Sequence, residues 1–182
     1  MLAQSPFPEF ESNVKGTESE IALVTAELEG DTGAVLIYST RCYGPTKQTI
    51  TVVRQKKGEW RAEKWTAQYS DRSKKELRSL TRKRLKVDKS IDRLLGELTA
   101  QGFWTMDQDS LNIDEKQVND STMSSIGISD GCSWAISVVY RGKYRLLSAY
   151  EPEQLQAFVF VQARERFLTC LKAMRTTLFA NS

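Results

Sequence analysis

Apolar residues recur at helical spacing in two parts of the chain. Over 87–101 they lie three or four residues apart and form one stripe, as on a helix that buries a single face. Asp88 is suited to cap the start of this helix, and Gly102 to end it in a left-handed conformation. Pro152 occupies a favoured first helical position, and a broader apolar stripe follows it as far as Phe179. These patterns predict two main helices, over 87–101 and 152–179.

Strand-like patterns fill much of the first third of the chain. Apolar residues on both faces of 20–29, turn residues over 30–33 and a β-rich run over 34–42 predict a first hairpin. Alternation over 49–55 and again over 59–69 predicts a second hairpin.

Aromatic residues and turn signals refine these strands. Trp60 and Trp65 are an odd number of residues apart, so their rings share a face only if a bulge intervenes. The clearest hairpin lies over 132–150, where alternating strands flank a tight Arg141-Gly142 turn. The polar stretch 105–130 is expected to be a long connection with one short strand around 125–128.

The order of the elements is strands, helix, hairpin, helix. That order favours an antiparallel sheet with segregated helices over alternating βαβ units. We therefore predict a single α+β domain over 19–182, in which two main helices pack on one face of a twisted antiparallel sheet. A flexible or draped N-terminal arm over 1–18 precedes it. No run of about 18 apolar residues is present, so no membrane span is expected.

Positive charge is concentrated in one segment. The chain of 182 residues carries a net charge of +3, whereas 72–89 alone contains nine Lys or Arg and two acids. Such a cluster attracts an acidic protein or nucleic-acid phosphates, or is simply the solvated start of a helix. It contains no aromatic residue on which single-stranded bases could stack. The candidate partner-binding residues are Arg78, Arg82, Lys83, Arg84 and Lys86.

Histidine is absent from the chain. This excludes a serine or cysteine nucleophile paired with an imidazole base, and also an imidazole-bound zinc ion. The acidic stretch 107–115 lacks the ligand positions of a calcium-binding EF-hand loop, and no glycine-rich phosphate loop opens a helix. We therefore predict no catalytic residue, no cofactor and no metal site, and expect a protein that is not an enzyme.

The three cysteines, Cys42, Cys132 and Cys170, are far apart and have no CxxC spacing. This argues against a zinc site or a thioredoxin-like motif. Cys170 falls in an apolar helical stretch and is expected in the core. Cys42 and Cys132 both lie at strand ends, so they are the better pair if the chain forms a disulfide. A cytosolic chain would instead keep all three thiols reduced.

Two features bear on location. The sequence Leu2-Ala3 followed by Gln4-Ser5-Pro6 resembles the surroundings of a signal-peptidase cleavage site, although an ordinary cytoplasmic N-terminus would fit as well. From Gly102 onward, the chain resembles a domain of uncharacterised bacterial envelope proteins and lipoproteins. The residues that carry this resemblance are Gly102-Phe103-Trp104, Asp130-Gly131, Trp134, Gly142, Tyr144 and Pro152.

The resemblance covers somewhat under half of the chain. Ser137 and Arg145 depart from its pattern, which has an acid and a histidine near those positions. It implies a location in the periplasm or cell envelope and no particular chemistry.

We therefore expect a non-enzymatic binding protein of the bacterial envelope, of the immunity or inhibitor type, that blocks a protein partner. One alternative is a cytoplasmic nucleic-acid-associated protein that uses 72–89. The other is a hydrolase that works with carboxylates in place of histidine.

Overall fold

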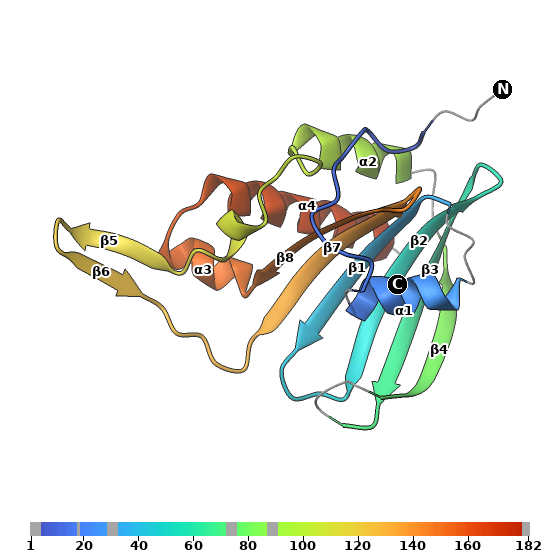
Figure 1. The fold of residues 1–182 in the computed structure, drawn as a ribbon, viewed down its shortest axis with the longest axis horizontal. Coiled ribbons are helices and arrows are strands. Elements are labelled where there is room, and N and C mark those ends of the chain that lie inside the picture. The colour runs from blue at the N-terminus through green and yellow to red at the C-terminus, as the bar shows by residue number, and fades with distance from the viewer. Residues whose placement is uncertain (1–4, 18, 29–32, 72–75, 87–90, 180–182) are drawn as a thin grey trace.

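A six-stranded antiparallel sheet forms the centre of the computed structural model, which describes residues 5–17, 19–28, 33–71, 76–86 and 91–179. The order of its strands is β4-β3-β2-β1-β7-β8 (Figure 1). Their bounds are β1 Val35–Cys42, β2 Lys47–Lys56, β3 Glu59–Tyr69, β4 Leu77–Leu85, β7 Cys132–Tyr140 and β8 Lys143–Tyr150. The predicted α+β class and its antiparallel sheet are confirmed.

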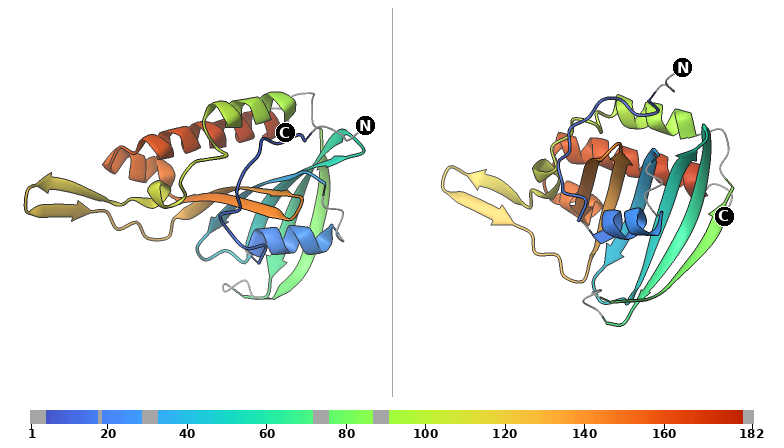
Figure 2. Two further views of the ribbon diagram at one scale, coloured as in Figure 1. Left: turned by 45° about the horizontal axis from the view of Figure 1, so that its top comes forward. Right: turned by 45° about the vertical axis from the view of Figure 1, so that its right-hand side comes forward.

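Two helices cover one face of this sheet, as predicted. They are α2 (Ile91–Ala100) and α4 (Gln162–Phe179), which lie side by side in the same layer (Figure 2). Their apolar stripes enclose the larger core together with Phe103 and Trp104, which follow α2 directly. The start expected for α2, 87–90 with its cap Asp88, lies outside the described residues.

The N-terminal arm contributes to the same core. Phe7 is only 3% exposed, and its ring lies 5.4 Å from that of Trp104 and 5.5 Å from that of Tyr140. Further along, the Asn13 amide donates to the Leu146 carbonyl oxygen at 2.8 Å and accepts from the Leu146 N–H at 2.9 Å. The described part of the arm, 5–17, is therefore draped over the domain and attached to it.

The other face of the sheet is covered by a helix where a strand was expected. The segment assigned to the first predicted hairpin forms α1 (Ser19–Glu27). Ile21, Val24 and Leu28 are buried in a second core with Trp65 of β3. They are spaced i, i+3 and i+7, so they fall on one helical face even though Ile, Val and Thr favour strands. The prediction of a hairpin over 20–42 was wrong in its first half.

The basic segment is also a strand, where the start of a helix was expected. Its described part forms β4, the edge strand next to β3, with a bulge between Gln68 and Tyr69 of β3. Trp60 and Trp65 lie on opposite faces of β3, since Trp60 packs against the α2–α4 core and Trp65 against α1. The odd spacing of the two rings therefore needs no bulge.

The long C-terminal helix predicted over 152–179 is broken in two. Pro152 does start a helix, but α3 (Pro152–Phe158) ends at Val159, which adopts an extended conformation, and α4 follows at Gln162. The break leaves Phe160 exposed. Arg164, at the start of α4, donates to the Val159 carbonyl oxygen at 3.0 Å and so holds the break in place.

The polar connection has more structure than expected. It contains a 3-10 turn, η1 (Asp109–Asn112), and a separate hairpin of β5 (Glu115–Asn119) and β6 (Thr122–Ser125). The expected strand at 125–128 was thus misplaced, because β6 ends where it was predicted to begin. The hairpin predicted over 132–150 is confirmed as β7–β8, with positive φ at both Arg141 and Gly142 as its two-residue turn requires.

Candidate functional site

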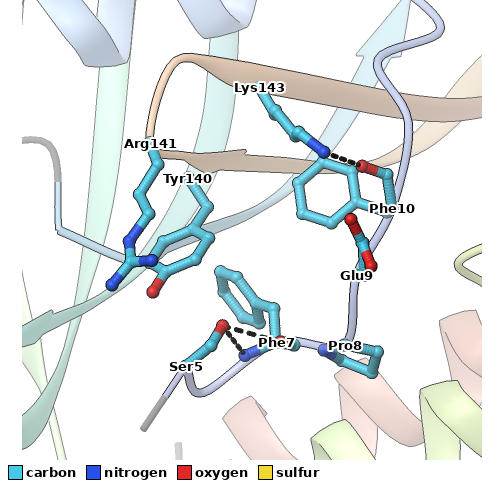
Figure 3. Close-up of a pocket in the computed structure, with 8 residues that line it drawn as sticks. All are labelled: Ser5, Phe7, Pro8, Glu9, Phe10, Tyr140, Arg141 and Lys143. Carbon is cyan, nitrogen blue, oxygen red and sulfur yellow. Dashed lines mark hydrogen bonds between the residues drawn. The ribbon is translucent and has the colours of Figure 1, made fainter. Parts of the chain in front are cut away.

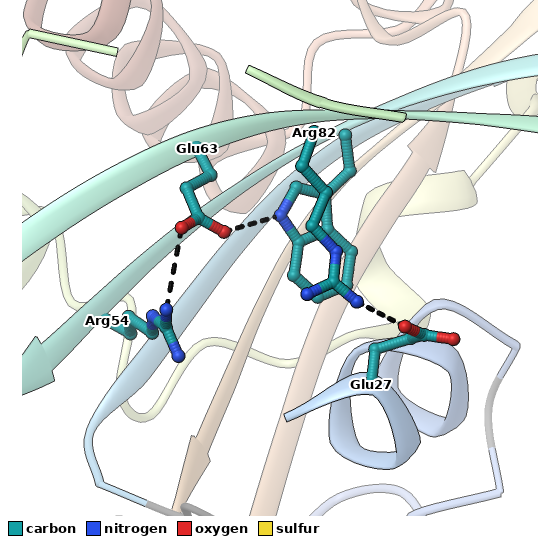
Figure 4. Close-up of polar contacts among 5 residues, drawn as sticks. Glu27, Arg54, Glu63 and Arg82 are labelled. Atoms are coloured by element: carbon teal, nitrogen blue, oxygen red, sulfur yellow. Dashed lines mark hydrogen bonds and ion pairs between the residues drawn. The ribbon is translucent and has the colours of Figure 1, made fainter. Parts of the chain in front are cut away.

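The predicted partner-binding residues lie on or next to β4, but they do not form one surface. Arg82 points toward α1, where it pairs with Glu27, and its guanidinium lies 4.4 Å from the centre of the Trp65 ring. Figure 4 shows this arginine between the strand and the helix. Arg82 therefore holds α1 to the sheet edge.

Acidic residues accompany the cations on this face. Glu63 of β3 lies directly opposite Arg84 and forms an ion pair with Arg54 of β2 at 3.5 Å (Figure 4). Glu63 also accepts a hydrogen bond from Trp65 Nε1 at 2.9 Å. Glu27 thus pairs with Arg82, whereas Glu63 pairs with Arg54 and lies across the ladder from Arg84.

Lys83 points to the opposite face of the sheet. Successive side chains on a strand alternate between faces, and the flanking Leu85 packs against the α2–α4 core. The direct cross-strand neighbour of Lys83 is Lys64 of β3. Arg78 lies at the bulge of the β3–β4 ladder and Lys86 follows the strand, both exposed. The five predicted residues are therefore divided between two faces and the two ends of β4.

The β5–β6 hairpin is a second candidate surface, and the sequence did not reveal it. It extends away from the body of the molecule (Figures 1 and 2), and every residue of β5 is exposed. Five large apolar side chains are exposed among the described residues, and four of them lie on this hairpin, directly before it or in the α3–α4 break. These four are Ile113 (42% exposed), Val118 (59%), Met123 (58%) and Phe160 (67%).

A buried arginine, Arg164, anchors the base of the hairpin. Arg164 Nε donates to the Leu111 carbonyl oxygen at 2.8 Å, and its Nη2 donates to that of Ile113. Burial lowers the pKa of Arg164, an effect that nearby Asp114 opposes. At the other side of the base, Lys116 Nζ lies 4.3 Å from the Phe158 ring centre. The hairpin is therefore mounted on fixed contacts while its strands stay exposed.

A small pocket lies between the N-terminal arm and the β7–β8 turn (Figure 3). Its volume is about 270 Å³, and it is lined by Ser5, Phe7, Pro8, Glu9, Phe10, Tyr140, Arg141 and Lys143. Lys143 Nζ donates to the Phe10 carbonyl oxygen at 3.0 Å, and the Arg141 guanidinium lies 5.0 Å from the centre of the Tyr140 ring. The lysine thus fastens the arm to the turn, and the arginine packs on its own strand.

The cysteines and carboxylates assemble no metal site in the parts that the structure describes. No three Cys, Asp or Glu side chains there are grouped so that they could hold a metal ion. Cys42 and Cys132, named above as the better pair if a disulfide forms, are joined by one. Cys170 is buried in α4, and burial raises the pKa of its thiol to about 12. That thiol is therefore unsuited to act as a nucleophile near neutral pH.

Over the described residues, no helix combines the length and the apolar character needed to cross a membrane. Comparison of the chain with protein-family models, with curated proteins and with solved structures found no match in any of the three.

Proposed function

We propose that this chain is a non-enzymatic binding protein that contacts another protein through the β5–β6 hairpin and blocks it, as an immunity or inhibitor protein does. The gathering of exposed apolar side chains at this one projecting element carries the proposal. Contiguous exposed apolar surface is uncommon on proteins that work alone and is typical of interaction sites.

The physical properties of the hairpin support a partner. A two-stranded hairpin is only marginally stable in water, so contact with another surface would stabilise it. Full burial of a side chain such as Val118 or Met123 contributes about 1.5–3 kcal/mol. A narrow projecting element also fits a concave surface, and concave surfaces are where proteins bind their ligands. Occupation of such a surface is the simplest way for this molecule to inhibit a partner.

We also propose the periplasm or cell envelope as its location. The Cys42–Cys132 disulfide supports this, because disulfides persist in oxidising compartments and are rare in the cytosol. Protein isolated from its own cells, denatured without reductant and treated with a maleimide, should gain one label, at Cys170. Three labels would instead favour the cytoplasm.

The proposed contact is tested by photocrosslinking from the hairpin. A photoreactive amino acid at position 118, in the cells that produce the protein, should yield an adduct with one dominant protein. The same amino acid at position 43 is the control, because Tyr43 is 76% exposed and lies outside the hairpin. Equal adducts from both positions would contradict the proposal.

The purified partner then decides whether binding inhibits it. The double variant Val118→Ser/Met123→Ser should weaken binding by at least about tenfold, since it removes two apolar contacts, whereas Tyr43→Ser should not. Both changes affect exposed side chains, so the fold should be retained. A partner that is bound but remains fully active would contradict the inhibitor role.

The two alternative hypotheses have less support. A nucleic-acid-associated protein would use the cations of 72–89, but Arg82 and Arg84 face Glu27 and Glu63. A carboxylate hydrolase needs two carboxylates that face each other across a site. Of the acids beside the basic strand, Glu27 and Glu63 are each paired with an arginine.

A further inference from the structure

We propose that the outer edge of β4 binds an extended acidic segment of a protein partner, which adds to the sheet as a further strand. Its carboxylates would lie against Lys83 and Lys64. The proposal rests on the proposed function in that the occupant is a protein, but it concerns a surface separate from the β5–β6 hairpin.

The edge itself supplies the backbone part of the site. β4 is the last strand in the sheet order, and none of its nine residues is buried. No described segment pairs with its outer side. An edge strand presents a row of unpaired N–H and C=O groups, and addition of an extended peptide to such a row is a common mode of protein recognition.

The charge of β4 indicates what kind of peptide fits. The strand contains four cations, Arg78, Arg82, Lys83 and Arg84, and no acid. Charged residues on an edge strand also serve to prevent aggregation, so charge alone would not indicate a ligand. The distribution of the charge between the two faces is more informative.

The two faces of this edge differ in whether carboxylates lie beside their cations. On the α1 face, Glu27 and Glu63 accompany the arginines. On the other face, Lys83 and Lys64 are direct cross-strand neighbours, an arrangement that destabilises a sheet. No acidic side chain in the described parts of the chain forms an ion pair with either lysine. A carboxylate on an added strand would relieve this repulsion.

The surroundings of the two lysines are suited to an added strand. The next cross-strand positions on the same face form a row of threonines that ends at Trp134 of β7. In register, this row is Thr40, Thr49, Thr66 and Thr81. Only Thr81 of this row lies on the edge strand, next to where an added strand would lie, since neighbouring strands are about 4.7–4.9 Å apart. Its hydroxyl can donate a hydrogen bond to an anion.

The alternation of strand side chains then fixes the pattern of the ligand. Carboxylates at every second residue all fall on one face of an added strand, where they meet Lys83. The residues between them meet the α1 face, where Glu27 and Glu63 would repel a further carboxylate, so an uncharged residue fits there. An alternating Thr-Glu peptide of ten residues has this pattern and is long enough to span the nine residues of β4.

The test measures binding of a fluorescent, acetylated and amidated (Thr-Glu)5 peptide to the full chain by anisotropy. Binding should weaken at least tenfold for Lys83→Glu, a change that leaves the fold intact because the new carboxylate lies opposite Lys64. Lys172→Glu is the matched control, because it makes the same charge change at an exposed position on α4. Equal weakening by both variants would overturn the proposal.

A second peptide separates strand addition from charge attraction. Methylation of alternate backbone nitrogens keeps every carboxylate but blocks one edge of the peptide from donating hydrogen bonds. Of the two peptides methylated on alternate sets of residues, at least one should lose binding tenfold. Unchanged binding of both, or equal affinity for a single-stranded oligonucleotide of the same charge, would overturn strand addition.

This outcome can be distinguished from failure of the proposed function. The variant Val118→Ser/Met123→Ser should bind the (Thr-Glu)5 peptide as the unchanged chain does. Peptide binding without any hairpin adduct would contradict the proposed function and leave the β4 site standing. A hairpin adduct without peptide binding would contradict the β4 site and leave the proposed function standing.

Discussion

At the scale of single residues, Arg164 is the polar side chain on which most of the local structure depends. It is fully buried and donates to the carbonyl oxygens of Leu111, Val159 and Ile113. Arg164→Lys keeps the charge, but one ammonium cannot reach three carbonyls as a planar guanidinium does. We expect it to lower the free energy of unfolding by about 2–4 kcal/mol, measured by urea denaturation. Arg166→Lys, at an exposed position on the same helix, is the control and should cost almost nothing.

The thiol of Cys170 should make stability depend on pH in the alkaline range. Burial raises its pKa from 9.0 to about 12 in the folded protein, so the folded state holds the proton more firmly than the unfolded chain does. The stability from this group is complete below about pH 9 and is lost as the pH rises toward 12.

The contribution of Cys170 is isolated by comparison with Cys170→Ala. Between pH 9 and 11, the free energy of unfolding of the unchanged protein should fall more steeply than that of the variant. The largest slope from one group is about 1.4 kcal/mol per pH unit. Other groups, including Tyr69, whose pKa burial also raises, titrate in both proteins. Parallel curves would therefore show that the thiol contributes nothing.

At the scale of elements, α2 ends as its sequence predicted. Gly102 has a φ of +71°, and the N–H of Phe103 donates to the Leu98 carbonyl oxygen at 3.1 Å. A side chain in this conformation costs about 1–2 kcal/mol, so Gly102→Ala should destabilise the protein by that amount in chemical denaturation. Gly96→Ala provides a control of opposite sign, because Gly96 lies inside α2 with open space around it. It should stabilise by about 0.5–1 kcal/mol.

Elements with an unambiguous local signal were predicted, and those decided by tertiary contacts were not. The alternation and tight turn of 132–150 and the stripe of α2 each indicated one structure. In α1, β-branched residues favoured a strand, but burial of Ile21 and Val24 against Trp65 selects the helix. In β4, Arg and Lys favour helices, but pairing with β3 across its whole length selects a strand.

The candidate sites show the same limit. Strand ends were sufficient to suggest the Cys42–Cys132 pair. The opposed orientations of Arg82 and Lys83 depend on their being in a strand, so they could not follow from a helical assignment. The β5–β6 hairpin has no alternation of apolar residues, because neither of its faces packs on a core. Exposed strands therefore leave little signal in a sequence.

At the scale of the whole molecule, the two proposed contact surfaces lie far apart. β4 is the last strand at one edge of the sheet, whereas the β5–β6 hairpin extends beyond the β8 side (Figure 1). Substitutions at positions that are far apart and share no contacts usually have additive effects on the free energy. If one partner touches both surfaces, substitutions at Lys83 and at Val118 should therefore change the free energy of binding additively.

The disulfide joins two parts of the sheet, the four strands β1–β4 and the two strands β7 and β8, at the pairing of β1 with β7. Every other pair of neighbouring strands in the six-stranded sheet is also adjacent in chain order, whereas β1 and β7 are separated by β2, β3 and β4. Cys42 of β1 and Cys132 of β7 are directly paired in this ladder. The bridge spans 90 residues. A loop of that length constrains the unfolded chain strongly, and its loss from a domain costs about 2–5 kcal/mol. Without the bridge, folding should also be slower, because this long loop must close before β1 and β7 can pair.

We therefore expect Cys42→Ser/Cys132→Ser to remain folded at low temperature. Compared with the oxidised protein, it should unfold at a lower urea concentration and refold more slowly. A reductant should shift the unchanged protein to the same behaviour and leave the double variant unaffected. A reductant that alters both equally would act elsewhere than at this bridge. If it alters neither, then β1 and β7 are held by their hydrogen bonds and core contacts alone, and the disulfide would have no role in joining the two parts of the sheet.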